Sequence, residues 1–363
     1  MALAKFNLQN QKDFVNVLKE RVNDYFKTKG ISKFGDSRLY WKTAAMLALY
    51  IVPFVLILIN FLPFWANWIG YTLMGIGMVG IGMSVMHDAI HGSYSSNKYV
   101  NKMMSFSMEL LGGNSFNWKV QHNVLHHTYT NIPGMDEDIS HKSILRLEPT
   151  GKWLKIHRFQ HIYALPIYSL LTLSWLLWSD FTSLFRYNKI GMTKMVGSKH
   201  ATEVTKLFLF KSVYIFALFV LPIFILGISW WQVIIGYVIM QMVAGFIFSV
   251  TFQLAHVVED TNYPLPDEDG NIENNWAVHQ MHTTANFAKK SRFMSWFIGG
   301  LNYQIEHHLF PNISHVHYPK ISDIVKNTAK EFKIPYHEYK SLRAALVSHL
   351  RRLKELGQQP AMA

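Results

Sequence analysis

His122–His127 reads HNVLHH and places three imidazoles within six residues. Residues about one turn apart lie near the same face of a helix, and His126 and His127 follow His122 by four and five residues, so we expect these side chains to project together. Two similar clusters occur elsewhere, HDAIH at His87–His91 and QIEHH at Gln304–His308. Because the chain contains no cysteine, three such clusters indicate a metal centre built from imidazole nitrogen.

The composition is that of a membrane protein. Of the 363 residues, 50% are apolar and only 16% are charged, whereas charged residues make up about 25% of soluble domains. The absence of cysteine excludes disulfides, zinc ribbons and cysteine-ligated iron–sulfur clusters. The fold class that we expect is all-α, with four transmembrane helices and a cytoplasmic helical cap that holds a dimetal site.

The first 42 residues are polar and basic, which argues against a cleavable signal peptide. Phe14, Val17, Leu18 and Val22 fall at helical spacing, so we expect a cytoplasmic or interfacial helix that lies on the surface. We therefore divide the chain into an N-terminal segment, residues 1–42, and one membrane domain, residues 43–363.

Several apolar runs are long enough to cross about 30 Å of hydrocarbon. Glycines recur in the second run, which predicts close packing against neighbouring helices. The run at 162–180 is ambiguous. If the three histidine clusters meet at one site, they lie on the same side of the membrane, so an even number of spans must separate them. Two spans, 207–227 and 230–252, already lie between the second and third clusters. We therefore interpret 162–180 as interfacial or re-entrant. The four spans that remain are 43–61, 68–86, 207–227 and 230–252.

The basic residues support this topology. Under it, the segments on the side of the histidine clusters hold 34 of the 35 Lys and Arg residues, and Lys211 lies in or near a span. The positive-inside rule then places the clusters and both termini in the cytoplasm, as in a bacterial inner-membrane protein. The net charge of +12 is explained by a collar that faces anionic lipid headgroups and not by nucleic-acid binding.

The number of histidines suggests two metal ions. The clusters hold seven, more than the roughly four to six ligands that one ion needs, and His256, just past the fourth span, makes eight. Imidazole suits iron, copper, zinc and nickel. There is no His-Glu-x-x-His metalloprotease motif, and soluble diiron proteins use Glu with Glu-x-x-His pairs instead. The pattern therefore favours redox chemistry over hydrolysis.

Other polar residues are expected to have supporting roles or none. Gln304 occupies a ligand-like position, where its amide could bind weakly or orient a neighbour. Four carboxylates could hold imidazole N–H groups, or could simply be solvated. These are Asp88, Asp136, Asp138 and Glu306. His279 and His282 could support the metal, face substrate or do neither. The isolated histidines are expected to be ordinary surface or interior residues, as at His157, His200, His337 and His349.

The three clusters, including HDAIHG at 87–92 and QIEHHLFP at 304–311, resemble the three histidine boxes of the membrane fatty acid desaturases. The resemblance implies four spans and a cytoplasmic non-haem centre of two iron ions. It implies O₂ as oxidant and a fatty acyl substrate linked to CoA, acyl carrier protein or lipid. The family's ligands fall on the seven box histidines, and a further ligand falls on His256. No catalytic residue is expected beyond these metal ligands.

Gln304 makes the third box similar to that of the front-end subgroup, which desaturates between an existing double bond and the carboxyl end. Many members of that subgroup carry a fused haem domain marked by His-Pro-Gly-Gly, which this sequence lacks. We therefore expect electrons from a separate donor such as a ferredoxin or a cytochrome. Two alternatives stay open, namely a lipid or alkane hydroxylase with the same centre, and a non-catalytic membrane carrier of metal or haem.

Overall fold

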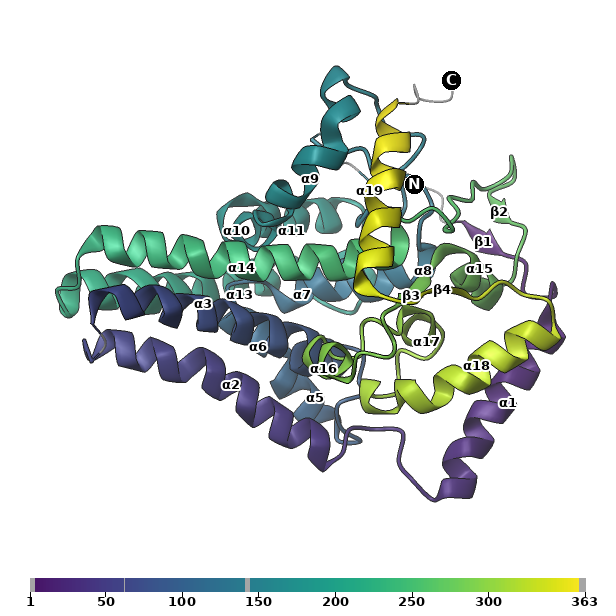
Figure 1. Cartoon of the computed structure of the whole chain (residues 1–363), viewed down its shortest axis with the longest axis horizontal. Helices are drawn as coiled ribbons and strands as arrows, with labels where there is room; N and C mark the ends of the chain where they lie inside the picture. The colour runs from purple at the N-terminus through teal and green to yellow at the C-terminus, as the bar shows by residue number, and fades with distance from the viewer. Residues whose placement is uncertain (1–3, 62, 141–143, 359–363) are drawn as a thin grey trace. The chain divides into compact units, whose positions relative to one another are not determined.

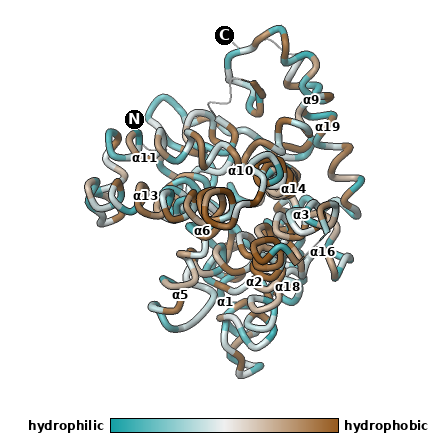
Figure 2. The backbone as a smooth tube through the Cα atoms, turned by 90° about the vertical axis from the view of Figure 1, so that its left-hand side faces the viewer, coloured by the Kyte–Doolittle hydropathy of each residue, from teal (hydrophilic) through white to brown (hydrophobic). Residues whose placement is uncertain are grey.

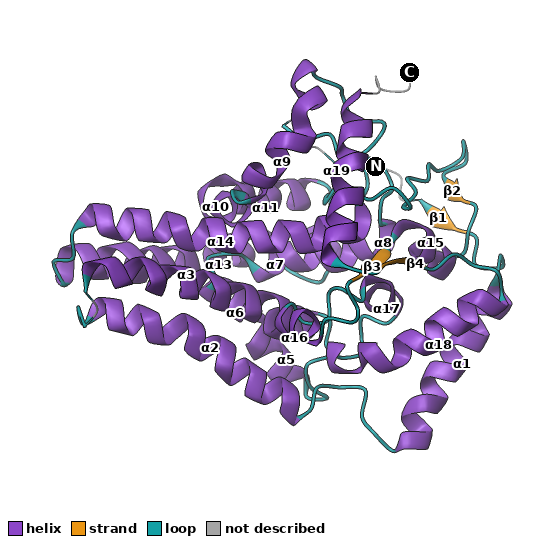
Figure 3. Ribbon diagram, in the orientation of Figure 1, coloured by secondary structure: helices purple, strands orange, loops and turns teal. Residues whose placement is uncertain are grey.

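The computed structural model describes residues 4–61, 63–140 and 144–358. Helices dominate the described residues, and the strands are four short pairing segments (Figure 3). This agrees with the expected all-α membrane fold. The chain forms two compact units. One combines Met1–Gly35, Gln121–Leu165 and Thr251–Ala363, and the other combines Asp36–Val120 and Pro166–Val250.

The second of these units, here called the membrane unit, holds the long apolar helices (Figure 1). Its first part contains α2 Ser37–Leu58, α3 Phe64–Gly80, the π-helix η1 Ile81–Met86, α4 His87–Ile90, α5 Lys98–Ser105, α6 Ser107–Leu110 and α7 Ser115–Trp118. Its second part contains α10 Leu171–Ser174, the π-helix η4 Trp175–Ser179, α11 Asp180–Lys189, α12 Met192–Met195, α13 His200–Ile215 and the π-helix η5 Phe216–Ile225. Two helices pass between the units, α9 Gln160–Tyr168 and α14 Trp230–His256.

Four helices are long and apolar enough to cross a membrane, and their apolar tracts are brown in Figure 2. This confirms the expected set of four. The helices run Ser37–Leu58, Phe64–Ile90, His200–Ile225 and Trp230–His256. The second continues beyond its expected end at residue 86, because η1 passes directly into α4 without a break. His87 therefore lies inside a helix and not after one.

The ambiguous segment is bent. Lys155–Tyr168 and Leu171–Lys189 are together long and apolar enough to form a span, but the chain turns by 72° between them. Such a geometry suits either a broken span or a re-entrant loop. Our interpretation of 162–180 as interfacial or re-entrant stays a prediction.

Glycines allow the helices of the membrane unit to approach closely. A Cβ at Gly75 would lie 2.6 Å from the carbonyl oxygen of Met240 in α14, and one at Gly77 would lie 2.8 Å from the amide nitrogen of Tyr50 in α2. Both neighbours are backbone atoms, which cannot swing aside. The glycine-rich helix α3 is thus packed against two others, as small residues in membrane helices predict.

A buried ion pair also stabilises the membrane unit. Lys211, within α13, contacts the Asp180 carboxylate at 2.6 Å, and both side chains are less than one tenth exposed. The ammonium group also donates to the carbonyl oxygens of Gly112 at 2.5 Å and Trp175 at 2.8 Å. Its three N–H groups therefore have three acceptors, which offset the free-energy cost of burying a charged group.

The first unit, here called the histidine unit, is built from three separate stretches of chain. Its N-terminal and central elements are β1 Lys5–Phe6, α1 Lys12–Lys29, most of the π-helix η2 Lys119–His126, α8 His127–Tyr129 and the 3₁₀-helix η3 Lys155–Phe159. Its C-terminal elements are β2 Asn271–Ile272, α15 Trp276–Thr283, β3 Ala285–Phe287, α16 Arg292–Phe297, α17 Gln304–Leu309, the 3₁₀-helix η6 His315–His317, α18 Tyr318–Glu331, β4 His337–Tyr339 and α19 Leu342–Gln358.

The N-terminal helix is part of the histidine unit's core. The expected helix forms as α1, but its apolar face is buried at Phe14, Leu18 and Val22 and packs against the elements around α18. Figure 1 shows the two helices side by side. Parallel pairing of β1 with β2 joins the same N-terminal region to residues 271–272. The segment is therefore held by protein and not merely laid on a surface.

Candidate metal centre

The second histidine motif lies on a π-helix. Lys119–His126 forms η2, and His127 begins α8 directly after it. The expectation of an α-helical face is corrected here, and the correction explains the spacing. Hydrogen bonds in a π-helix run from residue i to i+5, so positions four and five residues apart both lie near residue i. His126 and His127 are four and five residues after His122, so the wider turn presents all three rings together.

The third motif and His256 bring three more imidazoles into the histidine unit. His307 and His308 are completely buried on the short helix α17, and His256 is buried at the last position of α14. The structure therefore brings together six of the eight predicted ligands within one unit. These are His122, His126, His127, His256, His307 and His308.

Three of these rings form a triangle. The ring centroids are 4.7 Å apart for His126 and His256, 4.8 Å for His256 and His308, and 4.9 Å for His126 and His308. One ring nitrogen from each lies within 4.8 Å of the others. The separations are small enough for one metal ion to reach all three.

The remaining three rings form a second group. Nε2 of His127 lies 2.9 Å from Nε2 of His307 and 3.3 Å from Nε2 of His122. Three like nitrogen atoms converge on one small volume, an arrangement that a shared cation would stabilise, since each nitrogen can offer a lone pair. The two groups adjoin, because the rings of His127 and His308 stack at 4.4 Å.

The hydrogen bonds in the triangle leave Nε2 for a metal. Nδ1 of His126 lies 3.0 Å from the Asp136 carboxylate, and Nδ1 of His256 lies 3.3 Å from the Thr283 carbonyl oxygen. Both oxygens are acceptors, so each Nδ1 donates its proton. Nε2 of both rings is buried and has no hydrogen-bond partner among the described residues. Imidazoles that bind a metal through one nitrogen usually donate the other N–H in this way.

Asp136 anchors the loop after the second motif. Besides His126, it accepts hydrogen bonds from the backbone amides of Asn131 at 2.9 Å and Asp138 at 2.9 Å. The Asp138 carboxylate lies 3.4 Å from the same His126 nitrogen. Burial lowers the pKa of His126, but the two carboxylates outweigh burial and raise that pKa to about 9. The site therefore favours a cation at this ring, whether a proton or a metal ion.

Three residues that the sequence did not single out orient the histidines. Gln280 Oε1 accepts from His308 Nδ1 at 2.9 Å, which leaves His308 Nε2 to face the other rings. The Tyr318 hydroxyl lies 3.1 Å from His307 Nδ1. Asn131 adopts a left-handed backbone conformation and donates to the carbonyl oxygen of His256 at 2.8 Å. Only the neighbouring His279 gave any sequence signal near Gln280.

Gln304 and Glu306 are buried on α17 beside the histidines. The Gln304 carboxamide interacts with the ring of His256. The Glu306 carboxylate accepts from Asn286 at 2.8 Å and from the Tyr336 hydroxyl at 2.8 Å. Burial raises the pKa of Glu306. These hydrogen bonds connect α17 to β3 and to the residue before β4, and neither of them is to an imidazole.

The first motif lies in the membrane unit, at the end of the second long helix. His87 and Asp88 are almost completely buried and His91 is partly buried. The rings of the two histidines are 4.8 Å apart. The backbone carbonyl oxygen of Asp88 accepts from the amide of Ser93 at 2.8 Å and so stabilises the turn that follows. The four-residue spacing thus pairs the two rings as the sequence predicts.

Among the other histidines, His279 is buried and donates from Nε2 to the carbonyl oxygen of Thr130 at 2.8 Å. It therefore supports the loop after the second motif. Burial lowers the pKa of His279 to about 4 and that of the partly buried His282 by less. His349 is buried on α19, where its Nδ1 donates to the carbonyl oxygen of Val257 at 2.7 Å.

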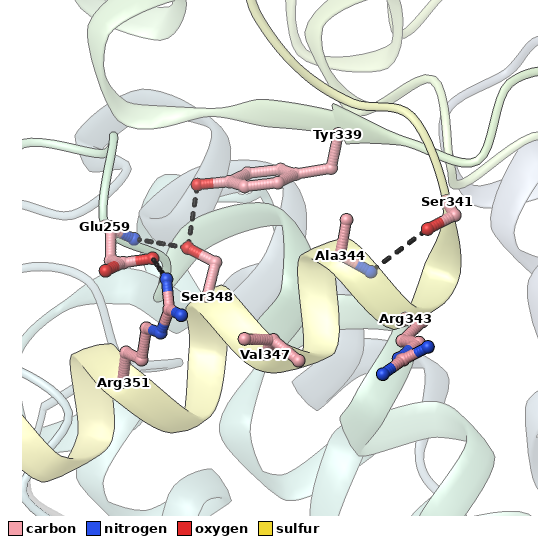
Figure 4. Close-up of a pocket in the computed structure, with 8 residues that line it drawn as sticks. All are labelled: Glu259, Tyr339, Ser341, Arg343, Ala344, Val347, Ser348 and Arg351. Carbon is pink, nitrogen blue, oxygen red and sulfur yellow. Dashed lines mark hydrogen bonds and ion pairs between the residues drawn. The ribbon is translucent and has the colours of Figure 1, made fainter.

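A pocket of about 380 Å³ opens beside α19 (Figure 4). Within it, the Ser348 hydroxyl lies 2.8 Å from the Tyr339 hydroxyl and accepts from the amide of Glu259 at 3.0 Å. Arg351 pairs with the Glu259 carboxylate at 3.9 Å. These polar groups largely satisfy one another, and no motif histidine lines the pocket. It therefore takes no part in the candidate metal centre.

The fold and the site define a class, that of membrane proteins with a buried cluster of histidines that could hold metal ions. Comparison with known proteins gives the family. The model described as fatty acid desaturase matches residues 62–340. The chain therefore belongs to the fatty acid desaturase family and is an oxidoreductase, as the three histidine boxes implied.

The relatives include front-end types. The chain is 34% identical to the sn-1 linoleoyl-lipid 6-desaturase of Synechocystis sp., over 97% of this chain and 98% of the relative. It is 33% identical to the enzyme of the same name from Arthrospira platensis, over 96% and 93% of the two chains. It is 36% identical to the acyl-lipid (8-3)-desaturase of Physcomitrium patens, over 95% of this chain and 72% of the relative.

Proposed function

We propose that this enzyme inserts a cis double bond into a lipid-linked fatty acyl chain, using O₂ and a pair of histidine-bound iron ions. The observation that carries the proposal is the convergence of six buried imidazoles, with His126 and His256 donating from Nδ1 and leaving Nε2 unpaired. The donor set contains nitrogen and no sulfur, which suits iron in a redox enzyme.

The six rings divide naturally into two sets of three. We assign His126, His256 and His308 to one ion, because their rings form the triangle. We assign the other set, whose Nε2 atoms converge around His127, to the second ion. On the basis of their motif alone, His87 and His91 are proposed as ligands that complete the set of eight. Gln304 is proposed as a weak or water-mediated ligand beside His256.

When bound, the two iron ions would supply the activation of O₂ and the removal of two hydrogens from a methylene pair. The protein's own residues do the rest. Asp136, Gln280 and Tyr318 fix the ring orientations, and burial of all six imidazoles excludes water from the site. Electrons come from an external donor such as a ferredoxin or a cytochrome, and O₂ is reduced to water. No separate general base is needed.

The substrate and its regiochemistry follow from the relatives and from Gln304. The relatives are named as lipid-linked acyl desaturases, so we propose an acyl chain carried on a membrane lipid. The new double bond would lie between an existing double bond and the carboxyl end. We propose a bacterial inner membrane with the histidine motifs and both termini on the cytoplasmic side, as the distribution of basic residues indicates.

The test is expression in a bacterial host that lacks polyunsaturated lipids, followed by mapping of double bonds in the extracted fatty acids. The wild-type chain should yield a new cis double bond, and the purified protein should contain iron. His126→Ala and His308→Ala should lose both the product and most of the iron, because each removes a ligand of the triangle. His200→Ala, at an isolated histidine, is the matched control and should retain both.

Two results would contradict the proposal. A product that carries added oxygen in place of unsaturation would identify a hydroxylase. Wild-type product levels from His126→Ala or His308→Ala would exclude these rings as essential ligands.

A further inference from the structure

Among the helices of the histidine unit that the structure describes, α16, Arg292–Phe297, is the one that has no buried residue. Phe293 is 73% exposed and Trp296 is 44% exposed, and the rings of Phe293 and Phe297 stack at 6.1 Å. By contrast, α1 buries its apolar face at Phe14 and its neighbours. Exposed aromatic side chains grouped on one short element mark an interaction surface.

The sequence around α16 carries charge of one sign. Lys289, Lys290 and Arg292 lie at its start, and the sequence from 274 to 305 contains no acidic residue. Lys289 is engaged by Glu338 at 3.2 Å, so its charge is partly neutralised. Lys290 and Arg292 are exposed. Basic residues beside exposed Phe and Trp are typical of segments that lie in the interface of a bilayer with anionic lipids.

A rigid turn connects α16 to the third histidine motif. Gly299 and Gly300 both have left-handed backbone conformations. A Cβ at Gly300 would lie 3.0 Å from the Cβ of His315, so a side chain is poorly accommodated there. Asn302 donates to the Ser295 hydroxyl at 2.9 Å across the same turn. The turn therefore fixes the position of α16 relative to α17, which begins at Gln304.

We propose that Lys290–Phe297 is an interfacial anchor that binds the anionic headgroup region of a lipid bilayer and so fixes the third histidine motif at the membrane surface. Phe293 and Trp296 enter the boundary between headgroups and acyl chains, while Lys290 and Arg292 contact lipid phosphates. The occupant is lipid and not protein, because the charges carried by the segment itself, on Lys290 and Arg292, are both positive and the aromatic surface is small. The anchor does not depend on the metal or on the reaction.

The absence of cysteine from the chain makes a direct test possible. A single cysteine introduced as Phe293→Cys carries a nitroxide spin label on the full-length protein in vesicles of phosphatidylglycerol and phosphatidylcholine. The accessibility of the spin label to oxygen, which concentrates in lipid, is compared with its accessibility to a nickel chelate, which stays in water. Val52→Cys on the exposed face of α2 gives the lipid reference, and Leu265→Cys in an exposed loop gives the water reference.

The label at 293 should resemble the lipid reference, with an oxygen-to-nickel ratio several-fold above that of the label at 265. Adding Lys290→Gln and Arg292→Gln should shift the label toward water, as should replacing the vesicles by pure phosphatidylcholine. A label as accessible to nickel as that at 265 would overturn the proposal. Protection from both reagents would also overturn it, since that result indicates contact with a second copy or another protein. Equal insertion into neutral vesicles would overturn the assignment to anionic lipid.

Discussion

His308 lies between the two groups of histidines, and the contacts of its Nδ1 with Gln280 at 2.9 Å and the Thr130 hydroxyl at 3.2 Å determine which nitrogen can bind a metal. Its Nδ1 donates to Gln280, so only Nε2 remains as a possible ligand atom. A nitrogen with one lone pair binds one metal ion, and therefore His308 cannot bridge two. The Gln280 side chain also lies 2.8 Å from the Thr130 hydroxyl, which holds the amide in place.

Replacement of Gln280 should weaken metal binding without removing a ligand. Gln280→Leu has a similar size but removes the nearer acceptor of the His308 proton, so the ring is held only by the Thr130 hydroxyl at 3.2 Å and its orientation and tautomer are less firmly fixed. Metal affinity should fall by roughly 10–100-fold, as for other lost supporting hydrogen bonds. Gln280→Glu keeps the acceptor and should bind iron nearly as the wild type does. Iron retained during titration with a chelator measures the effect, and equal retention by the Leu and Glu variants would contradict it.

His349 predicts a component of the pH dependence of stability. Burial lowers the pKa of His349 to about 4 from 6.5, although its hydrogen bond to Val257 raises that pKa slightly. Below pH 6.5 the unfolded chain binds a proton at this ring, while the folded chain does so only near pH 4. The contribution of His349 to the free energy of unfolding is therefore fully present above pH 6.5 and is lost as the pH falls toward 4. This contribution is roughly 3 kcal/mol at most.

The variant His349→Asn tests this component. Asparagine can donate to the Val257 carbonyl oxygen but does not titrate in this range. The thermal unfolding temperature of the wild type should therefore fall more steeply between pH 6.5 and 4 than that of the variant. Parallel curves would show that His349 does not contribute.

At the scale of single residues, the sequence indicates candidate ligands but not the groups that orient them. The histidines repeat at characteristic spacings in three places, and Asp136 follows the second motif closely. Gln280 lies 28 residues before His308 and Tyr318 lies 11 residues after His307, with no repeated pattern. Such partners are selected by tertiary packing, which leaves no periodic mark on the sequence.

Among the elements, the π-helix η2 is the one that local propensity could not reveal. The apolar pattern of Lys119–His126 is compatible with any helix, and the choice of hydrogen bonds to i+5 is made by the surroundings. The long spans were easier to predict, since length and hydropathy alone define them. Their ends were not, because the first long helix already begins in polar sequence at Ser37 and the second continues through the first histidine of its motif to Ile90.

The ion pair between α13 and α11 should be essential for folding of the membrane unit. Lys211→Met leaves the Asp180 carboxylate buried without its partner, a loss worth about 3–5 kcal/mol. The unfolding temperature in detergent should therefore fall sharply. The double variant Lys211→Met with Asp180→Asn removes both charges and should recover part of the loss.

The control for this pair is Lys206→Met on the same helix. Lys206 contacts Glu203 at 2.9 Å, and its own side chain is 40% exposed, although that of Glu203 is only 6% exposed. The Ser198 hydroxyl also donates to the Glu203 carboxylate at 2.6 Å, so the change leaves this carboxylate with a partner and should cost less than Lys211→Met. If Lys211→Met is as stable as Lys206→Met, the buried pair contributes nothing to the stability of the fold.

For the whole molecule, the sequence predicted the class and the number of membrane-length helices because both follow from composition and apolar length. It did not predict that the histidine unit takes its chain from three stretches separated by spans. The predicted boundary after residue 42 followed a change in polarity and stays a prediction. Lys42 is buried within α2, and the core around Phe14 includes residues from the C-terminal third. Contacts across such distances in sequence are invisible to local patterns.

This discontinuous construction has a consequence for synthesis of the chain. The strand β1 pairs with residues 271–272, and α1 packs against α18. The N-terminal segment is made first, but it cannot complete these contacts until α18, near the C-terminus, has emerged from the ribosome. The ring of His126 can meet that of His308 only after two more long apolar helices have been made. The histidine centre is therefore assembled late, after the helices that enter the bilayer, and a chain released early would carry histidine ligands without a site in which to use them.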